Sequence, residues 1–451
     1  MFDSEQRGWI ELDTLRHHAQ GGNVPGNIDR IDSATPIGRS PRKLIPISVA
    51  TLAFAAGSGA SAAESDRPTF SFSGFGTLGM VHSNEDRADF ATSAVKPSGA
   101  GYTRSWSPDV DSRIGAQIVG DFNSRLSATV QVIAEQRYDD KYTPHLEWAN
   151  IKYQVTPELS VRAGRTVLAS FIFSDSIKVG YANPWVRPPV EVYSLVPISN
   201  IDGVEATYTP HFGGFVHTLS GIYGRSNLRL PDGGVSKSRQ QWIISDTVEY
   251  GPATARIAYL NADMSIASLN ELPNAFRQFG PEGIALADRY DVIHTPIRFL
   301  SVGGMYNPGD WFAVAEWGAS DLGSLLGKRT AWYASGGYRI GEFTPYVTYA
   351  GAKANSHTSD PGLSVSSLPP QLAGPAVALN AALNVLLSSI PVQKAIAVGA
   401  RWDFMNGATL KVQYDHNRLG AGSPGTLVNL QPDFQRGGTV SLFSATLDFV
   451  W

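Results

Sequence analysis

Charged side chains recur at alternate positions in several segments of this 451-residue chain, on the same face as other polar residues. The candidate site combines basic residues from successive segments with acidic residues further along the chain: Arg113, Arg125, Arg137, Lys152, Arg162, Asp175 and Glu191. The same parity holds for Asp111, Glu135, Glu316, Arg401, Asp403, Lys411 and Asp415. In a water-filled space, such a cluster of basic residues would set up a transverse field. A solvated outer surface explains single charges, but explains this succession of basic residues less well.

Other kinds of chemistry have weaker signals. The chain has no cysteine and a formal net charge of −4, so a thiol nucleophile is excluded and a nucleic-acid partner is not expected. The histidines show no metal-binding spacing, and we expect no metal and no cofactor. Gly74, Gly76 and Gly79 match a dinucleotide-binding pattern, but they lie inside a strand-like segment, where glycine allows curvature or close packing.

The segments that position these charges alternate apolar and polar residues from Phe70 to Trp451, as strands do when the two faces of a sheet differ in polarity. We predict sixteen strands: 70–82, 109–121, 125–137, 146–155, 159–167, 201–209, 214–224, 240–249, 253–263, 298–306, 311–319, 328–339, 343–352, 394–405, 408–418 and 438–451.

The connections between these strands alternate between short and long. The short ones contain Gly, Pro, Asn or Asp, which tight turns require, whereas the long ones include 83–107, 168–200, 264–297 and 353–393. Short turns at one rim and long loops at the other are typical of outer-membrane barrels. The predicted fold is therefore all-β: a 16-stranded antiparallel transmembrane β-barrel with short periplasmic turns and long extracellular loops.

Aromatic residues favour a membrane barrel over a soluble sandwich. Trp311 and Trp317 share a face, and six residues of strand span roughly 20 Å, close to the height of a lipid-facing band between aromatic girdles. The chain ends on an alternating apolar strand, which would leave an exposed edge in a soluble protein but closes against the first strand in a barrel. Asp246 is an exception, because it has the parity of the lipid-facing residues.

The N-terminal region predicts export. Residues 41–62 combine Arg42 and Lys43, an apolar run and a small-residue cleavage site, which is the order found in signal peptides. We expect cleavage after Ala62 or Ala63. Residues 1–40 fit no part of such a signal and form an unexplained extension, and residues 63–451 form the barrel domain.

Two long connections have features of their own. The segment between 167 and 201 contains four prolines, and its acidic groups are expected to face the basic wall and narrow the pore. A flexible exterior loop is the alternative. The apolar stretch 372–390 has the length of a membrane helix, but its position between two strands favours a helix within a loop.

The sequence resembles the general porins of Gram-negative bacteria. The resemblance rests on "DSRIGAQIVGDFNSRLSATVQV", "ELSVRAGRTV" with "NIDGVEATYTPHFGGFVHTLSGIYG", and the terminal "SLFSATLDFVW". The ending is similar to an assembly signal read by the barrel assembly machinery, and this implies roles for Phe443, Leu447, Phe449 and Trp451. A Pro-Glu-Phe-Gly-Gly stretch typical of the third loop is missing. The resemblance implies a homotrimer in outer-membrane lipids, with the third loop folded into the lumen.

The expected function is passive diffusion of small hydrophilic solutes and ions across the outer membrane, without catalysis. A porin selective for sugars, phosphate or organic acids is the first alternative. A barrel-embedded hydrolase is a further alternative, because a catalytic triad is a spatial arrangement that cannot be recognised from sequence order. A secreted adhesin is another alternative.

Overall fold

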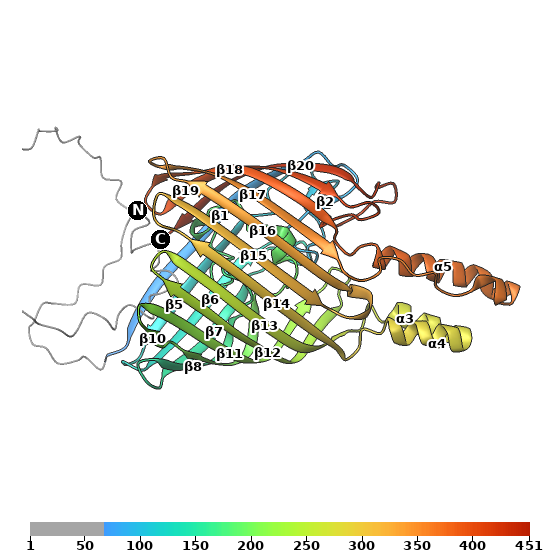
Figure 1. Ribbon diagram of the computed structural model, residues 1–451, viewed down its shortest axis with the longest axis horizontal. Helices are drawn as coiled ribbons and strands as arrows, with labels where there is room; N and C mark the ends of the chain where they lie inside the picture. Colours follow the sequence, from blue (N-terminus) through green and yellow to red (C-terminus); the bar gives the residue numbers. More distant parts are fainter. Residues whose placement is uncertain (1–66) are drawn as a thin grey trace, which may run out of the picture. The chain divides into compact units, whose positions relative to one another are not determined.

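The computed structural model describes residues 67–451, apart from the side chain of Ser324, and these residues form a closed antiparallel β-barrel (Figure 1). The described sheet has eighteen strands, of which β4 (Trp106–Ser107) and β10 (His211–Phe212) have two residues each, so sixteen (18 − 2) long strands remain. The long strands are β1 (Thr69–Ser83), β5 (Arg113–Asp121), β6 (Leu126–Glu135), β7 (His145–Gln154), β8 (Leu159–Val167), β9 (Asn200–Tyr208), β11 (Phe215–Arg229), β12 (Val235–Tyr250), β13 (Ala253–Ile266), β14 (Thr295–Tyr306), β15 (Trp311–Asp321), β16 (Lys328–Tyr338), β17 (Phe343–Ala354), β18 (Gln393–Met405), β19 (Ala408–Leu419) and β20 (Gly438–Val450).

The barrel closes where the first strand meets the last. β1 pairs with β20 from Phe75 opposite Val450 to Ser83 opposite Leu442. Two glycines make this seam possible, because a Cβ on Gly76 would lie 2.4 Å from the ring of Phe449, and one on Gly74 would lie 2.0 Å from the ring of Trp451. The glycine pattern in β1 therefore packs against the C-terminal aromatic residues.

The outward face of the barrel is apolar, as a lipid-facing surface must be. Ile257 and Val302 project outward and are exposed. Aromatic residues border this band: Trp311 pairs with Tyr338 next to the short turns, and Trp317 pairs with Trp332 further along the same strands. The predicted sixteen-stranded barrel with one apolar and one polar face is confirmed.

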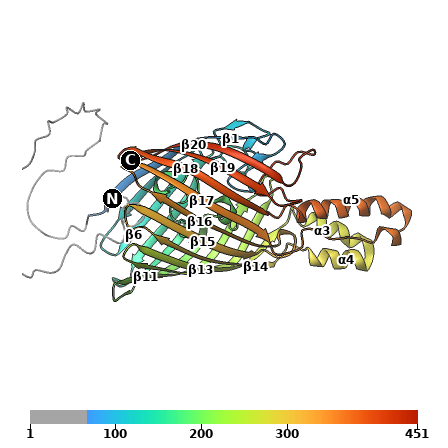
Figure 2. The ribbon, with the colours of Figure 1, turned by 45° about the horizontal axis from the view of Figure 1, so that its top comes forward.

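Three helices lie in the long extracellular loops and project past the strand ends (Figures 1 and 2). α3 (Glu271–Phe276) and α4 (Gly280–Arg289) lie between β13 and β14, and α5 (Pro370–Leu387) lies between β17 and β18. Leu383 of α5 is buried in the same cluster as Phe276 of α3. Among the described helices, α5 is long and apolar enough to cross a membrane by length and composition alone. The predicted loop helix is thus present.

One predicted connection is much shorter in the structure. β11 continues to Arg229 and β12 starts at Val235, so the expected long loop 225–239 is reduced to residues 230–234. A register shift between Arg239 and Trp242 lets the pairing continue beyond the predicted strand ends. The predicted extension 1–40 and signal peptide 41–62 lie outside the described residues.

Candidate pore constriction

The connection between β8 and β9 folds into the barrel, where α2 (Val190–Tyr193) lies among the strands (Figure 1). The backbone N–H of Leu168 donates to the carbonyl of Ser199 at 2.8 Å, so the two ends of this inner loop (residues 168–199) meet. Its prolines prevent longer regular structure, and α2 and a 3-10 turn, η2 (Gly180–Ala182), are its helical elements. Contacts with the wall must therefore hold the loop in place.

Apolar side chains of the inner loop pack against the inward faces of β14 and β16. The rings of Phe171 and Phe299 lie 5.2 Å apart, and those of Trp185 and Tyr333 lie 5.6 Å apart. The indole N–H of Trp185 also donates to Ser335 at 2.8 Å. These residues belong to one buried cluster, so this part of the lumen is a packed core.

Charged side chains of the wall form hydrogen bonds with backbone N–H and carbonyl groups of the inner loop. Glu316 accepts hydrogen bonds from the N–H of Ile172 at 2.8 Å and from the hydroxyl of Tyr193 at 2.7 Å. Lys411 donates to the carbonyls of Gly180 and Trp185 at 2.6 and 3.0 Å, and Arg401 donates to two further loop carbonyls. Buried polar groups need such partners, which explains why a loop without regular structure can lie inside the barrel.

Arg187 connects the inner loop to Asp111, which lies in the first extracellular loop just before β5, and to Ser444 on the wall. Its guanidinium donates to both carboxylate oxygens of Asp111, at 2.9 and 2.6 Å, and to the hydroxyl of Ser444 at 2.7 Å. Asp415 lies 3.5 Å away. A two-point arginine–carboxylate contact fixes orientation as well as distance.

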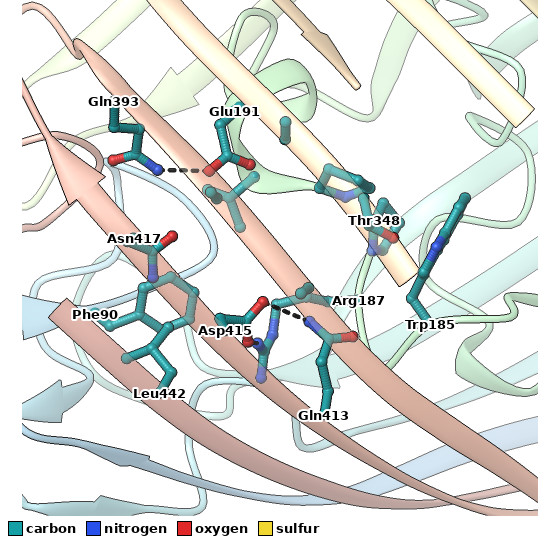
Figure 3. A pocket seen from close by; sticks show the side chains of 16 residues that line it. Phe90, Trp185, Arg187, Glu191, Thr348, Gln393, Gln413, Asp415, Asn417 and Leu442 are labelled. Carbon is teal, nitrogen blue, oxygen red and sulfur yellow. Dashed lines mark hydrogen bonds and ion pairs between the residues drawn. The ribbon is translucent and has the colours of Figure 1, made fainter. Parts of the chain in front are cut away.

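A small cavity lies beside Arg187, between the inner loop and β17–β19 (Figure 3). The side-chain amide of Gln393 donates to Glu191 at 2.6 Å on its rim. Burial raises the pKa of Glu191, although the hydrogen bond from Gln393 opposes this shift. The cavity volume is about 30 Å³, enough for two or three water molecules. The loop therefore fits closely against this side.

Inward side chains differ between two parts of the barrel. We call the inward faces of β14–β20 the covered wall, where Ser301, Glu316, Thr348 and Ser444 are buried. We call the inward faces of β5–β9 the open wall, where Gln117, Thr129, Lys152, Arg162 and Thr207 are only partly buried. The inner loop thus fills one side of the lumen and leaves polar groups accessible on the other.

Three of the predicted basic residues lie on the open wall. Arg162 donates to Glu205 at 2.9 Å, and Lys152 is opposite Arg162 in the β7–β8 pairing. Arg113 is 3.8 Å from Glu135 and donates to the carbonyl of Ile177 in the inner loop at 3.3 Å. The structure therefore brings Lys152 and Arg162 together and places Arg113 beside the loop.

The other two basic residues lie outside the strands, which differs from the predicted strand 125–137. Arg125 is exposed in the short turn before β6. Arg137 follows the other end of β6, and its guanidinium lies 5.4 Å from the centroid of the Tyr138 ring. β6 spans Leu126–Glu135, so these two arginines are at opposite ends of the strand and cannot both join one constriction with Arg162.

The two predicted acidic residues of the loop lie in different surroundings. Glu191 bonds to Gln393 on the covered wall, away from the predicted basic residues. Asp175 is half-buried, and burial raises its pKa while the cations Arg256 and Arg162 oppose the shift. Loop cations also bond to carboxylates: Lys178 bonds to Glu135, and Arg187 bonds to Asp111. The inward parity of Glu135 and Asp111 could be predicted from the sequence, but no local pattern identifies Lys178 and Arg187 as their partners.

Two further observations concern Asp246 and the distribution of His, Asp and Glu side chains. Asp246 does face outward, and its partner is His217 on the neighbouring strand, with a separation of 3.2 Å. Among residues 67–451, no group of three or more His, Asp or Glu side chains could hold a metal ion.

The closed barrel, its lipid-facing band and its inner loop define a transmembrane β-barrel channel. The sequence matches the Gram-negative porin family over residues 50–442, so the chain belongs to this family and lies in the outer membrane. The OmpF complex with daunomycin from Salmonella typhi is 11% identical, with 86% of this chain and 98% of that chain covered and a TM-score of 0.51. The channel DcaP of Acinetobacter baumannii is 12% identical, with coverages of 85% and 98% and a TM-score of 0.50. These likenesses concern the fold. No curated protein sequence matches.

Proposed function

We propose that the protein is a passive diffusion pore, without catalytic activity, for small hydrophilic solutes and ions. The observation that carries this proposal is the open wall, where polar and charged inward residues stay accessible beside the edge of the inner loop. Solutes would cross between this loop and β5–β9, and the width and charge of that passage would determine which solutes pass.

The charges along this passage are of both signs. Arg113, Lys152, Arg162 and Lys178 lie there with the carboxylates of Asp121, Glu135, Glu147 and Glu205. Burial raises the pKa of Asp175 and so disfavours its charged form. The two basic residues Lys152 and Arg162, opposite each other in the β7–β8 pairing, support as a second candidate a pore selective for phosphate or organic acids.

Ion selectivity tests this proposal. In planar bilayers with a KCl gradient, Arg162→Gln should shift the reversal potential toward cation preference relative to the parent, most clearly at low salt where screening is weak. Lys394→Gln on the outward face is the matched control, since it removes the same charge away from the lumen. An unchanged reversal potential in Arg162→Gln would place the passage elsewhere.

Solute competition separates the two candidate functions. A selective pore should show saturable block of the KCl current by phosphate or a dicarboxylate, whereas a general pore should show only a conductance that scales with ion concentration. Removing residues 174–196 should raise single-channel conductance and admit larger solutes, provided that the variant still runs as a folded, heat-modifiable barrel.

Assembly and export complete the proposal. Phe443, Leu447, Phe449 and Trp451 lie on the outward face at the closing seam, which supports a role in recognition by the barrel assembly machinery. A homotrimer in outer-membrane lipids is the expected state, and chemical cross-linking in intact membranes would test it. N-terminal sequencing of the outer-membrane protein should begin at Ala63 or Glu64.

A further inference from the structure

A β-bulge in β7 turns an aromatic side chain toward the lumen on the open wall. Gln131 of β6 is opposite Trp148. The next residue of β6, Val132, is opposite Leu146, so β7 has one extra residue between the two pairs. Gln131 faces the lumen, because it donates to an inward glutamine of β5 at 2.9 Å. Residues directly opposite each other share a face, so Trp148 projects inward, whereas Leu146 projects toward lipid and is exposed.

The indole ring of Trp148 remains available to a solute. Trp148 belongs to neither of the two buried apolar clusters, and within residues 67–451 its indole N–H donates to no other group. The side chain is partly exposed, whereas its neighbour Gln131 is almost fully buried. The ring therefore lies over polar groups of the wall and presents its other face to the water in the lumen.

A guanidinium lies beside this ring. The β7–β8 pairing ends one residue before Trp148 and Thr166, which are therefore neighbours on the inward face. Arg162 extends toward them along β8, because its Nη1 donates to the hydroxyl of Thr166 at 3.3 Å. Gly164 lies between these two residues of β8, and its lack of a side chain leaves room for the extended arginine. The indole and the guanidinium thus lie at the same height in the barrel.

The side-chain groups that remain free at this place are hydrogen-bond donors. Arg162 uses Nη1 to bond to Thr166 and Glu205, and within residues 67–451 its Nε and Nη2 make no hydrogen bond. The carboxylate of Glu205 is already engaged, since it also accepts from Ser220 at 2.8 Å and is almost fully buried. Together with the indole N–H, the site offers donors and an aromatic face. It therefore suits a ligand whose polar end only accepts hydrogen bonds.

We propose that Trp148 and Arg162 form a binding subsite for aromatic carboxylates that pass through the lumen. The ring of the solute stacks on the indole, and its carboxylate accepts hydrogen bonds from Nε and Nη2 of Arg162, in the two-point geometry that arginine offers to carboxylates. A sugar would need acceptors as well as donors, and the engaged Glu205 does not supply them. The inference rests on the proposed diffusion pore and narrows its second candidate to one chemical class.

Block of the KCl current in planar bilayers tests the subsite, with benzoate as the probe and acetate as the matched anion without a ring. Benzoate should block the parent at a lower concentration than acetate. Trp148→Leu, which keeps an apolar side chain, should raise the half-blocking concentration of benzoate roughly three- to tenfold, as expected for the loss of one aromatic stacking contact, and should leave that of acetate unchanged. Trp317→Leu removes an indole from the outward face and should behave like the parent.

Two further arms separate the ring from the charge. Trp148→Phe keeps an aromatic face and should retain most of the block by benzoate. Arg162→Gln should weaken the block by benzoate and by acetate, and benzamide, which has the ring without the charge, should block the parent more weakly than benzoate does. Heat-modifiable migration verifies that each variant is folded, and the comparison of benzoate with acetate and benzamide needs the parent alone.

Three results would overturn the subsite. Benzoate could block the parent no better than acetate, Trp148→Leu could change the block by both anions equally, or Trp148→Phe could lose as much as Trp148→Leu. The second result would mean that position 148 affects only the width of the pore. A parent that conducts KCl, with a reversal potential that depends on Arg162 but no preference for benzoate, would refute the subsite and leave the diffusion pore intact. A parent without conductance would refute both.

Discussion

The covered wall and the open wall have the same backbone pattern but very different environments. On the covered wall, Lys411 and Asp448 are both 0% exposed, with their charged atoms 3.0 Å apart. On the open wall, Arg162 and Glu205 are 2.9 Å apart, but the side chain of Arg162 is 29% exposed. The difference shows that one barrel can combine a packed interior, which stabilises the inner loop, with a wet surface along which solutes can move.

Hydrogen bonds explain how the covered wall tolerates buried charge. Lys411 also donates to two loop carbonyls, and Asp448 accepts a hydrogen bond from Thr77 at 2.5 Å. A buried ion pair is favourable only when its remaining donors and acceptors are satisfied. The inner loop and β1 supply those partners, so the loop position and the ion pair depend on each other.

The largest expected effect comes from the seam, which lies at the edge of the covered wall. Deleting residues 449–451 removes the rings that pack against Gly74 and Gly76, together with the backbone bonds between Gly74 and Trp451. We expect loss of the folded barrel from the outer membrane, measured by heat-modifiable migration and cell fractionation. Normal insertion of the truncated chain would contradict the assembly role of this ending.

Breaking the buried ion pair should have the next largest effect. Lys411→Met leaves Asp448 buried and uncompensated, at a cost of about 3–5 kcal/mol in the free energy of unfolding. Arg162→Met should cost less, because the side chain of Arg162 is 29% exposed and water can partly solvate the Glu205 carboxylate that remains. Guanidinium unfolding in detergent, followed by tryptophan fluorescence, measures both changes. Equal losses in the free energy of unfolding would mean that the covered wall and the open wall depend equally on their ion pairs.

Cysteine accessibility compares the walls directly, since the chain has no cysteine of its own. A charged methanethiosulfonate reagent should lower the conductance of Thr129→Cys on the open wall. We expect modification of Thr348→Cys on the covered wall to be at least about tenfold slower, because it requires local opening. Val130→Cys, which faces outward, controls for labelling outside the pore. Similar rates at positions 129 and 348 would show that water reaches both walls.

The smallest expected effect concerns Glu191, the acidic residue of the inner loop that lies at the covered wall. Burial raises the pKa of Glu191 above its ordinary value of 4.5, so its ionised form is disfavoured in the folded protein. Stability should therefore fall as pH rises from the ordinary value through the raised one. Glu191→Gln should remove this loss of stability with rising pH, and the variant should be more stable than the parent at neutral pH.

Unfolding midpoints at several pH values would measure this difference. The gap between Glu191→Gln and the parent should shrink below pH 4.5, where the parent carboxyl is protonated in both states. Glu158→Gln, in an exposed turn, controls for the loss of one negative charge. A constant gap across the pH range would argue that packing, and not ionisation, causes the effect.

The sequence by itself determined the strands, because alternation between lipid and interior acts on each residue locally. Sixteen strands, their turns, the closing strand and the loop helix could all be predicted in this way. The inner loop was predicted to be inside, but its partners were not, since they come from distant parts of the chain. Trp185 bonds to Ser335 across 150 positions, and Lys411 to Gly180 across 231.

The tertiary structure alone decided which wall is covered and which charges meet. Arg125 and Arg162 look equivalent by parity, yet one lies in a turn and the other on the open wall. Parity specifies the face of a residue, but neither its height in the barrel nor the loop that covers it. Those depend on strand register and on the burial of Trp185 and Val192, which no local pattern encodes.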